Sequence, residues 1–111
     1  MLKLFTVITL LAASFGGTAT AENYVVDQKN KTFLYNGVKA EILKVKVGDV
    51  VEFRNLDPYF HNVFSLSDAM LFDLGSYPAG QSKSVTFDKP GKVEVECAIH
   101  PLMKMTVEVK K

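Results

Sequence analysis

The stretch Lys92-Val93-Glu94-Val95-Glu96-Cys97 alternates charged and apolar residues up to its final cysteine. Successive side chains of a β-strand point to opposite faces, so this alternation predicts a strand with one buried and one solvated face. Cys97 shares its parity with Val93 and Val95, so we expect its thiol at the inward end of a core strand. The stretch therefore indicates a β-protein that places its only cysteine at one end of the core.

Similar β-rich runs fill the chain from residue 23 onward, with no convincing helix pattern between them. Asn36-Gly37 predicts a hairpin turn because both residues tolerate positive φ. The segment 67–80 is rich in Asp, Gly and Pro and predicts a long irregular connection. We expect strands at 24–26, 32–35, 38–47, 51–54, 61–66, 82–87, 92–97 and 106–110. Seven to eight short strands at this spacing predict an all-β fold, a two-sheet β-sandwich.

Residues 1–21 have the pattern of a signal peptide. Lys3 precedes an apolar run over 4–13, and Ala19-Thr20-Ala21 matches the small-residue pattern at which such leaders are cleaved. The run is shorter than the roughly 20 residues that span a bilayer, although an N-terminal anchor helix is the alternative. We expect cleavage after Ala21 and one periplasmic or otherwise exported domain over residues 22–111, without a membrane span.

Charge and cysteine content restrict the possible functions. Loss of Lys3 with the leader would leave as many basic residues as the 12 acidic ones. This balance argues against binding to nucleic acid or strong binding to a membrane surface, and we expect a monomer. A lone cysteine has no partner for an internal disulfide, and a free thiol in an oxidising compartment is a liability unless it is buried, catalytic or ligated.

Soft metal ligands are concentrated near the end of the chain. Cys97, His100 and Met103 follow one another at intervals of three, so one tight loop can turn a thiolate, an imidazole and a thioether toward one point. His61, one of only two histidines, opens a predicted strand earlier in the chain. Two imidazoles, a thiolate and a weak thioether suit copper better than other common metals. Met105 is the alternative to Met103, since both have the parity of the last strand's valines.

The chain resembles the cupredoxins, the type 1 blue-copper proteins, and is most similar to their plastocyanin and amicyanin branch. The resemblance covers nearly all of residues 22–111 and rests on Val47-Gly48-Asp49-Val50-Val51-Glu52-Phe53, Asn55-Leu56-Asp57, His61-Asn62-Val63 and Cys97-x-x-His100-Pro101-x-Met103. It implies a Greek-key β-sandwich with one copper ion at its loop-bearing end. It also implies the metal ligands His61, Cys97, His100 and Met103.

The resemblance also bears on details around these ligands. The family's axial methionine is followed by x-Gly-x-Val, and Met105 stands at that glycine if Met103 is axial, which favours Met103. The side chain of Asn62 is expected to connect the two ligand-bearing loops. The family has proline where this chain has Ile99, and the extra backbone N–H is a candidate second donor to the Cys97 sulfur, beside that of Asn62.

The resemblance implies a carrier of single electrons that cycles Cu(II) and Cu(I), and not an enzyme. Redox partner proteins would dock near His100, over an apolar surface formed by Pro58, Tyr59, Phe60, Pro101 and Leu102. Copper delivery or storage with the same residues is the alternative function. A secreted thiol enzyme is disfavoured because Cys97 and His100 share one tight loop without a clear orienting carboxylate or amide.

Overall fold

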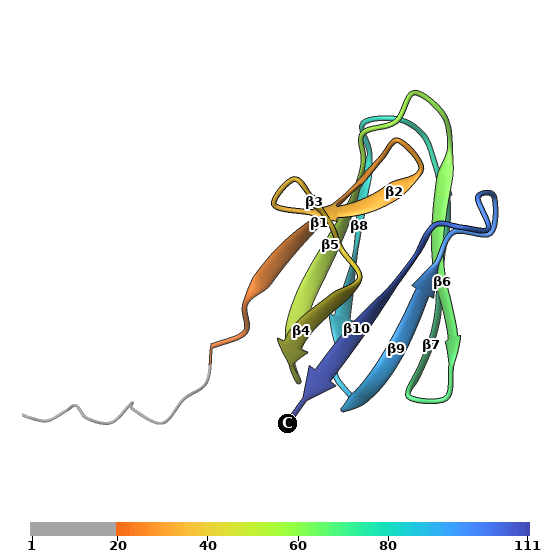
Figure 1. Cartoon of the computed structure of the whole chain (residues 1–111). Coiled ribbons are helices and arrows are strands. Elements are labelled where there is room, and N and C mark those ends of the chain that lie inside the picture. Colours follow the sequence, from red (N-terminus) through yellow and green to blue (C-terminus); the bar gives the residue numbers. More distant parts are fainter. Residues whose placement is uncertain (1–19) are drawn as a thin grey trace, which may run out of the picture.

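The computed structural model describes residues 20–111, which fold into two facing β-sheets (Figure 1). The strands are β1 (Asn23–Lys29), β2 (Thr32–Tyr35), β3 (Val38–Lys39), β4 (Ile42–Lys46), β5 (Asp49–Asn55), β6 (His61–Ser67), β7 (Met70–Tyr77), β8 (Ser82–Phe87), β9 (Gly91–Glu96) and β10 (Lys104–Lys110). The signal peptide expected over 1–21 lies almost wholly outside the described residues. Within residues 20–111, no helix is long and apolar enough to cross a membrane.

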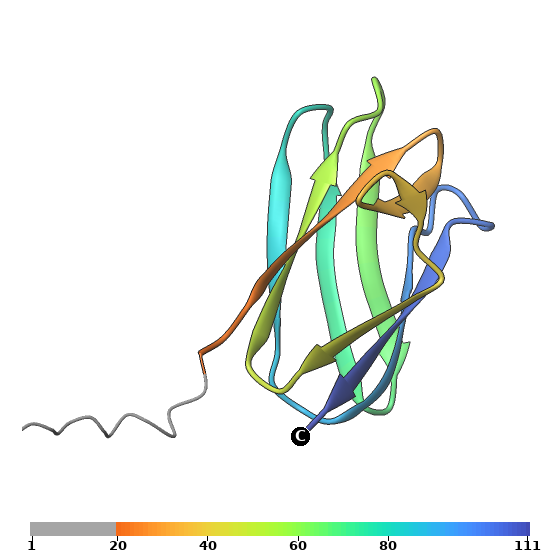
Figure 2. The same cartoon turned by 60° about the vertical axis from the view of Figure 1, so that its left-hand side comes forward.

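One sheet has the strand order β3-β2-β1-β5-β8, and the other has the order β4-β10-β9-β6-β7. Neighbouring strands are antiparallel except for the pairs β1–β5 and β4–β10, which are parallel. Strands that are not consecutive in sequence are therefore neighbours in both sheets, as Greek-key connections require. Figure 2 shows the two sheets packed face to face. The predicted all-β sandwich is confirmed, and residues 20–111 form ten strands where seven to eight were expected.

The segment 38–47 is not one continuous strand. β3 belongs to the first sheet and β4 to the second, so the chain crosses between the sheets at residues 40–41. Ala40 is buried at this crossing, and its N–H donates to the carbonyl of Phe33 at 2.8 Å. The hairpin predicted at Asn36-Gly37 is confirmed, because both residues have positive φ and Tyr35 pairs with Val38.

The prediction of an irregular connection over 67–80 is wrong, because β7 occupies most of this segment and pairs with β6. Asn62 pairs with Ser76 and Phe64 with Asp73, so β7 carries one extra residue between these pairs. Gly75 lies in this bulge with φ +74°, and its N–H donates to the Asp73 carboxylate at 2.8 Å. The residues that suggested a loop therefore form a bulge inside a strand.

The hydrophobic core lies between the sheets and is filled by alternating residues of each strand. Val51 and Phe53 of β5 are fully buried, as are Val93 and Val95 of β9. Cys97 continues the inward row of β9 with 1% exposure, as the alternation predicts. The inward row of β9 therefore ends in the Cys97 thiol, at one end of the core.

Candidate metal centre

Two neighbouring strands place the first two candidate ligands side by side. His61 is the first residue of β6, and Cys97 directly follows β9. β6 and β9 pair antiparallel with Phe64 opposite Glu96, which brings the start of one to the end of the other. The strand that begins at His61 therefore lies beside the strand that ends before Cys97, and both side chains are buried.

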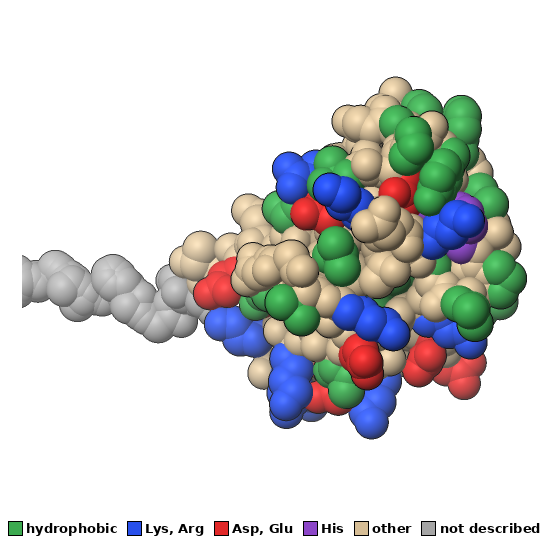
Figure 3. All heavy atoms as spheres, turned by 45° about the horizontal axis from the view of Figure 1, so that its top comes forward, with side chains coloured by type: hydrophobic (Ala, Val, Ile, Leu, Met, Phe, Trp, Pro, Cys, Tyr) green, Lys and Arg blue, Asp and Glu red, His purple; other side chains and the backbone are tan. Residues whose placement is uncertain are grey.

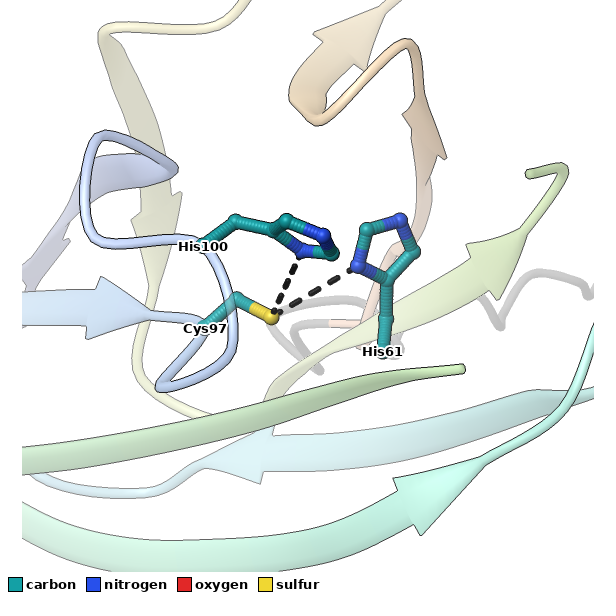
Figure 4. A group of neighbouring side chains, drawn as sticks. All are labelled: His61, Cys97 and His100. Carbon is teal, nitrogen blue, oxygen red and sulfur yellow. Dashed lines mark hydrogen bonds between the residues drawn. The ribbon is translucent and has the colours of Figure 1, made fainter. Parts of the chain in front are cut away.

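The side chains of His61, Cys97 and His100 converge, and both imidazoles turn Nδ1 toward the sulfur (Figure 4). Cys97 Sγ lies 3.5 Å from His61 Nδ1 and 3.7 Å from His100 Nδ1. One ligand atom from each of the three residues lies within 4.8 Å of the others. Nitrogen and sulfur bonded to one ion at about 2.0 and 2.3 Å, at trigonal angles, are about 3.7 Å apart. The three donors thus have the spacing and the chemistry of a shared metal ion.

The loop after β9 is closed by its own backbone hydrogen bonds. The N–H of His100 donates to the Cys97 carbonyl at 3.2 Å, and the N–H of Met103 donates to the His100 carbonyl at 2.9 Å. The N–H of Cys97 donates back to the Met103 carbonyl at 3.2 Å. The intervals of three between these residues therefore correspond to two successive turns, and the closing bond holds Met103 beside Cys97.

Asp57 fixes the orientation of His61. Its Oδ2 lies 2.7 Å from His61 Nε2, and both side chains are buried. With Nε2–H donating to this carboxylate, Nδ1 keeps its lone pair on the side of Cys97. The sequence reasoning gave Asp57 no such role. The available signal was an aspartate four residues before a candidate histidine, but only the fold shows that the intervening loop turns it back onto the ring.

Asp57 also holds the turn between β1 and β2. Its carboxylate accepts the backbone N–H of Asn30 at 2.6 Å and that of Lys31 at 3.0 Å. Burial alone raises the pKa of Asp57, but the hydrogen bonds from His61 and from these two N–H groups outweigh it and lower the pKa below its ordinary value. Asp57 is therefore an anion at neutral pH, and its charge favours the His61 tautomer that leaves Nδ1 free.

Two asparagines connect the segments that carry the ligands. Buried Asn55 donates from Nδ2 to the carbonyls of Tyr59 and Tyr77 and accepts the N–H of Asp57 at 2.9 Å. Asn62 accepts the N–H of Ala98 through Oδ1 at 2.8 Å, which confirms that it connects the two ligand-bearing segments. The sulfur contacts described above involve histidine ring nitrogens, so a hydrogen bond from the Ile99 N–H to the sulfur stays a prediction.

The two candidate methionines have different positions. Met103 precedes β10, is 1% exposed and belongs to the same buried cluster as Cys97. Met105 is the first inward residue of β10 and pairs with Val95, two residues before the cysteine. The inward row of β10 thus begins at Met105, which is the register expected if Met103 is the axial ligand.

His100 is the partly exposed member of the cluster. Tyr59 lies against both histidines, with ring centroids 5.4 Å from each. Partial burial, followed by the nearby charges of His61 and Lys31, lowers the pKa of His100, which favours the neutral imidazole that can bind a metal. Figure 3 shows hydrophobic side chains around the exposed histidine surface, and this surface is that of His100 because His61 is fully buried.

The sandwich and its His-Cys-His cluster define a cupredoxin. The family model described as copper binding proteins of the plastocyanin/azurin family matches residues 21–110, and the chain belongs to this family. Copper is therefore its cofactor, which agrees with the soft thiolate and imidazole donors that the fold brings together.

Two relatives are similar over most of this chain. The methylamine utilization protein MauL of Methylorubrum extorquens is 29% identical over 110 residues, a match that covers 98% of this chain and 93% of the relative. A Cu(I) amicyanin variant of known structure is 27% identical with a TM-score of 0.69, and the match covers 79% of this chain and 82% of that one.

A further match is only a part of a larger protein. The copper-containing nitrite reductase of Thermus scotoductus SA-01 is 25% identical with a TM-score of 0.69, over 80% of this chain. The match covers only 22% of the reductase chain. The likeness is therefore to one part of that enzyme.

Proposed function

We propose that residues 22–111 form one exported copper domain, released from a signal peptide over 1–21, that carries single electrons between redox proteins. Copper would be held by His61, Cys97, His100 and Met103, and it would supply a one-electron Cu(II)/Cu(I) couple. The observation that carries the proposal is the buried Cys97 sulfur with the Nδ1 atoms of two histidines at 3.5 and 3.7 Å.

The ligands are held so that they need to move little during electron transfer. His61 is fixed at both ring nitrogens, by Cys97 on one side and Asp57 on the other. Cys97 and His100 share a loop closed by three backbone hydrogen bonds. A donor set that the protein holds in one arrangement suits a carrier, because neither oxidation state then requires rearrangement.

His100 offers the route by which electrons would enter and leave. It is the only one of the three clustered donors with partial exposure; the Tyr59 ring lies against it, and the exposed Leu102 lines the same groove. A partner that covers this surface would bring its own centre close to the copper ligands. We propose that the protein acts as a monomer and docks its redox partners here.

The burial of Cys97 argues against an enzymatic role. Cys97, His61 and Asp57 have the connectivity of a thiol nucleophile, base and orienting acid. However, Cys97 is only 1% exposed and His61 is fully buried, so a substrate would not reach the sulfur. The same burial argues against copper delivery or storage, because exchange with the ligands of a recipient protein needs an accessible site.

The test is the absorption and paramagnetic-resonance spectrum of the copper-loaded mature protein, compared with its Cys97→Ser variant. We expect an intense blue thiolate-to-Cu(II) charge-transfer band that the variant lacks. Copper transfer to an excess of a Cu(I) chelator should be slow. A colourless protein that binds Cu(I) and gives it up rapidly would contradict the carrier and support delivery.

A further inference from the structure

A groove of about 490 Å³ opens beside His100, between the loop that carries the ligands and the turns that flank β2. Ile99, Leu102 and the side chains of Lys31, Lys39 and Lys104 are among the residues that line it. We propose that this groove binds a carboxylate-bearing surface of the redox partner, with an apolar contact at its centre. The inference rests on the proposed carrier function and names the chemistry of the partner.

The apolar part of this surface belongs to the ligand loop itself. Leu102 is 94% exposed and Ile99 is 49% exposed, although both lie within three residues of a candidate ligand. The loop between them is held by the backbone bonds of His100 and Met103, so these side chains are presented on a fixed frame. Exposed apolar side chains on a rigid loop are typical of a protein-binding surface.

The charged part of the groove has a single sign. Three lysines line it, and no carboxylate does. The only ion pairs among residues 20–111 are Arg54–Asp27 and His61–Asp57, so these lysines are not neutralised by pairing. Residues 22–111 contain equal numbers of basic and acidic residues, so this positive rim is a local excess. Such a rim attracts an acidic surface and repels a basic one.

The three lysines do not contribute equally. Lys104 pairs across the sheet with Glu96, and a neighbouring hollow that Lys39 and Lys104 also line contains Glu41 and Glu94. Lys31 lines only the first groove, which no carboxylate lines. We therefore expect Lys31 to contribute most to the selection of the partner, and Lys39 to contribute next.

Lys31 is also held in place more firmly than an ordinary surface lysine. It lies in the two-residue turn between β1 and β2 with φ +56°, and its N–H donates to the buried carboxylate of Asp57. Its Nζ lies 5.8 Å from the centroid of the Tyr59 ring, a cation–π contact beside the metal cluster. The carboxylate that orients His61 therefore also positions the charge that would meet the partner.

The experiment uses one redox probe in two charge states. A c-type cytochrome with lysines around its haem edge is compared with the same cytochrome after succinylation, which replaces those positive charges by carboxylates. One electron passes from the reduced copper protein to ferric haem, which leaves Cu(II) and ferrous haem. We expect the succinylated probe to react about tenfold faster at low salt, and this preference to vanish as ionic strength rises.

The variant Lys31→Glu/Lys39→Glu should reverse the preference between the two probes. The matched control is Lys89→Glu, which changes an exposed charge between β8 and β9, at the opposite end of the sandwich. This control should keep the wild-type preference. An unchanged visible spectrum and reduction potential in each variant shows that any effect lies in docking and not in the copper site.

Equal rates with the two probes, or an equal effect of Lys89→Glu and the double variant, would overturn the proposal. A wild-type protein that binds copper without redox activity would instead contradict the carrier function. In that case, binding of the same two cytochromes to the copper-free protein is followed by NMR. Shifts at Lys31, Lys39 and Leu102 with the succinylated probe alone would support the acidic partner, and their absence would contradict it.

Discussion

At the scale of single residues, Asp57 connects three features of the molecule. Its carboxylate accepts hydrogen bonds from the ring of His61 and from the backbone of the β1–β2 turn. A buried anion is stable there because three donors surround it. The same anion sets the nitrogen with which His61 faces Cys97, so one side chain links local folding to the geometry of the metal centre.

We expect Asp57→Asn to weaken copper binding about 10–100-fold, because the His61 tautomer loses its anionic acceptor. The variant should also lose about 1–3 kcal/mol of stability, because an amide NH₂ would face backbone donors. Competition with a copper chelator and urea unfolding measure the two effects. Asp27→Asn is the control, since Asp27 forms a pair with exposed Arg54 and should change stability by less than about 1 kcal/mol.

The pKa of Asp57 adds a dependence on pH to this prediction. Because the pKa is lowered in the folded protein, the contribution of the anion is complete above the ordinary value of 3.8 and is lost as the pH falls through the lower folded value. The stability difference between wild type and Asp57→Asn should therefore shrink only at acidic pH. A difference that shrinks already near neutral pH would contradict this assignment.

A matched pair of leucine substitutions distinguishes Met103 from Met105 as the axial copper ligand. Both side chains are buried, so each change should cost less than about 1.5 kcal/mol. We expect Met103→Leu to shift the visible spectrum and the reduction potential, and Met105→Leu to leave both unchanged. The opposite pattern in spectroelectrochemistry would assign the axial position to Met105.

At the scale of elements, the β1–β2 turn has an unusual backbone. Asn30 and Lys31 both have positive φ, at 54° and 56°, although neither is glycine. Two-residue hairpin turns of this kind favour Asn-Gly, because a left-handed conformation costs other residues about 1–2 kcal/mol. Lys31 is strained at a position where it lines the same groove as His100. We infer that the positive charge of Lys31 is kept here at the expense of the stability that glycine would give the turn.

Lys31→Gly should therefore raise the stability of the protein by about 1 kcal/mol, even though it removes a side chain. Lys29→Gly, two residues earlier in β1, should instead lower stability by about 0.5–1 kcal/mol, because it loosens a strand. Urea unfolding of the two variants compares the positions directly. Loss of stability in both would mean that Lys31 is not strained.

The sequence predicts well the elements that depend on local patterns, and less well the features that depend on contacts between distant parts of the chain. The alternation that ends at Cys97 and the Asn36-Gly37 hairpin are local signals, and both are confirmed. The bulge at Gly75 and the crossing at Ala40 interrupt a regular period, so their strands were misjudged. Asp57 was missed because its contact with His61 exists only after the loop between them has folded.

At the scale of the whole molecule, the sandwich provides the metal centre with a frame that does not depend on the metal. The core extends through both sheets, and Cys97 and Met103 form part of it as apolar side chains. His61 already has its carboxylate partner and a neighbouring sulfur. The donors are therefore assembled by the packing of β5, β6, β9 and β10.

We expect the copper-free protein to remain folded, with an unchanged far-UV circular dichroism spectrum. Copper should raise its thermal midpoint, because a ligand that binds the folded state stabilises it by about 2.7 kcal/mol at a hundredfold excess over Kd. Calorimetry of both forms measures this difference. An unfolded copper-free protein would show that the metal, and not the core, organises the site.

The central claim is that His61, Cys97, His100 and Met103 hold one copper ion that exchanges single electrons. Spectroelectrochemistry of the copper-loaded protein, produced as residues 22–111, tests it most directly. We predict an intense blue band that bleaches on reduction and returns on oxidation, following a one-electron Nernst curve through repeated cycles. A protein with no blue band, or with copper that is lost or does not reoxidise on cycling, would contradict the claim.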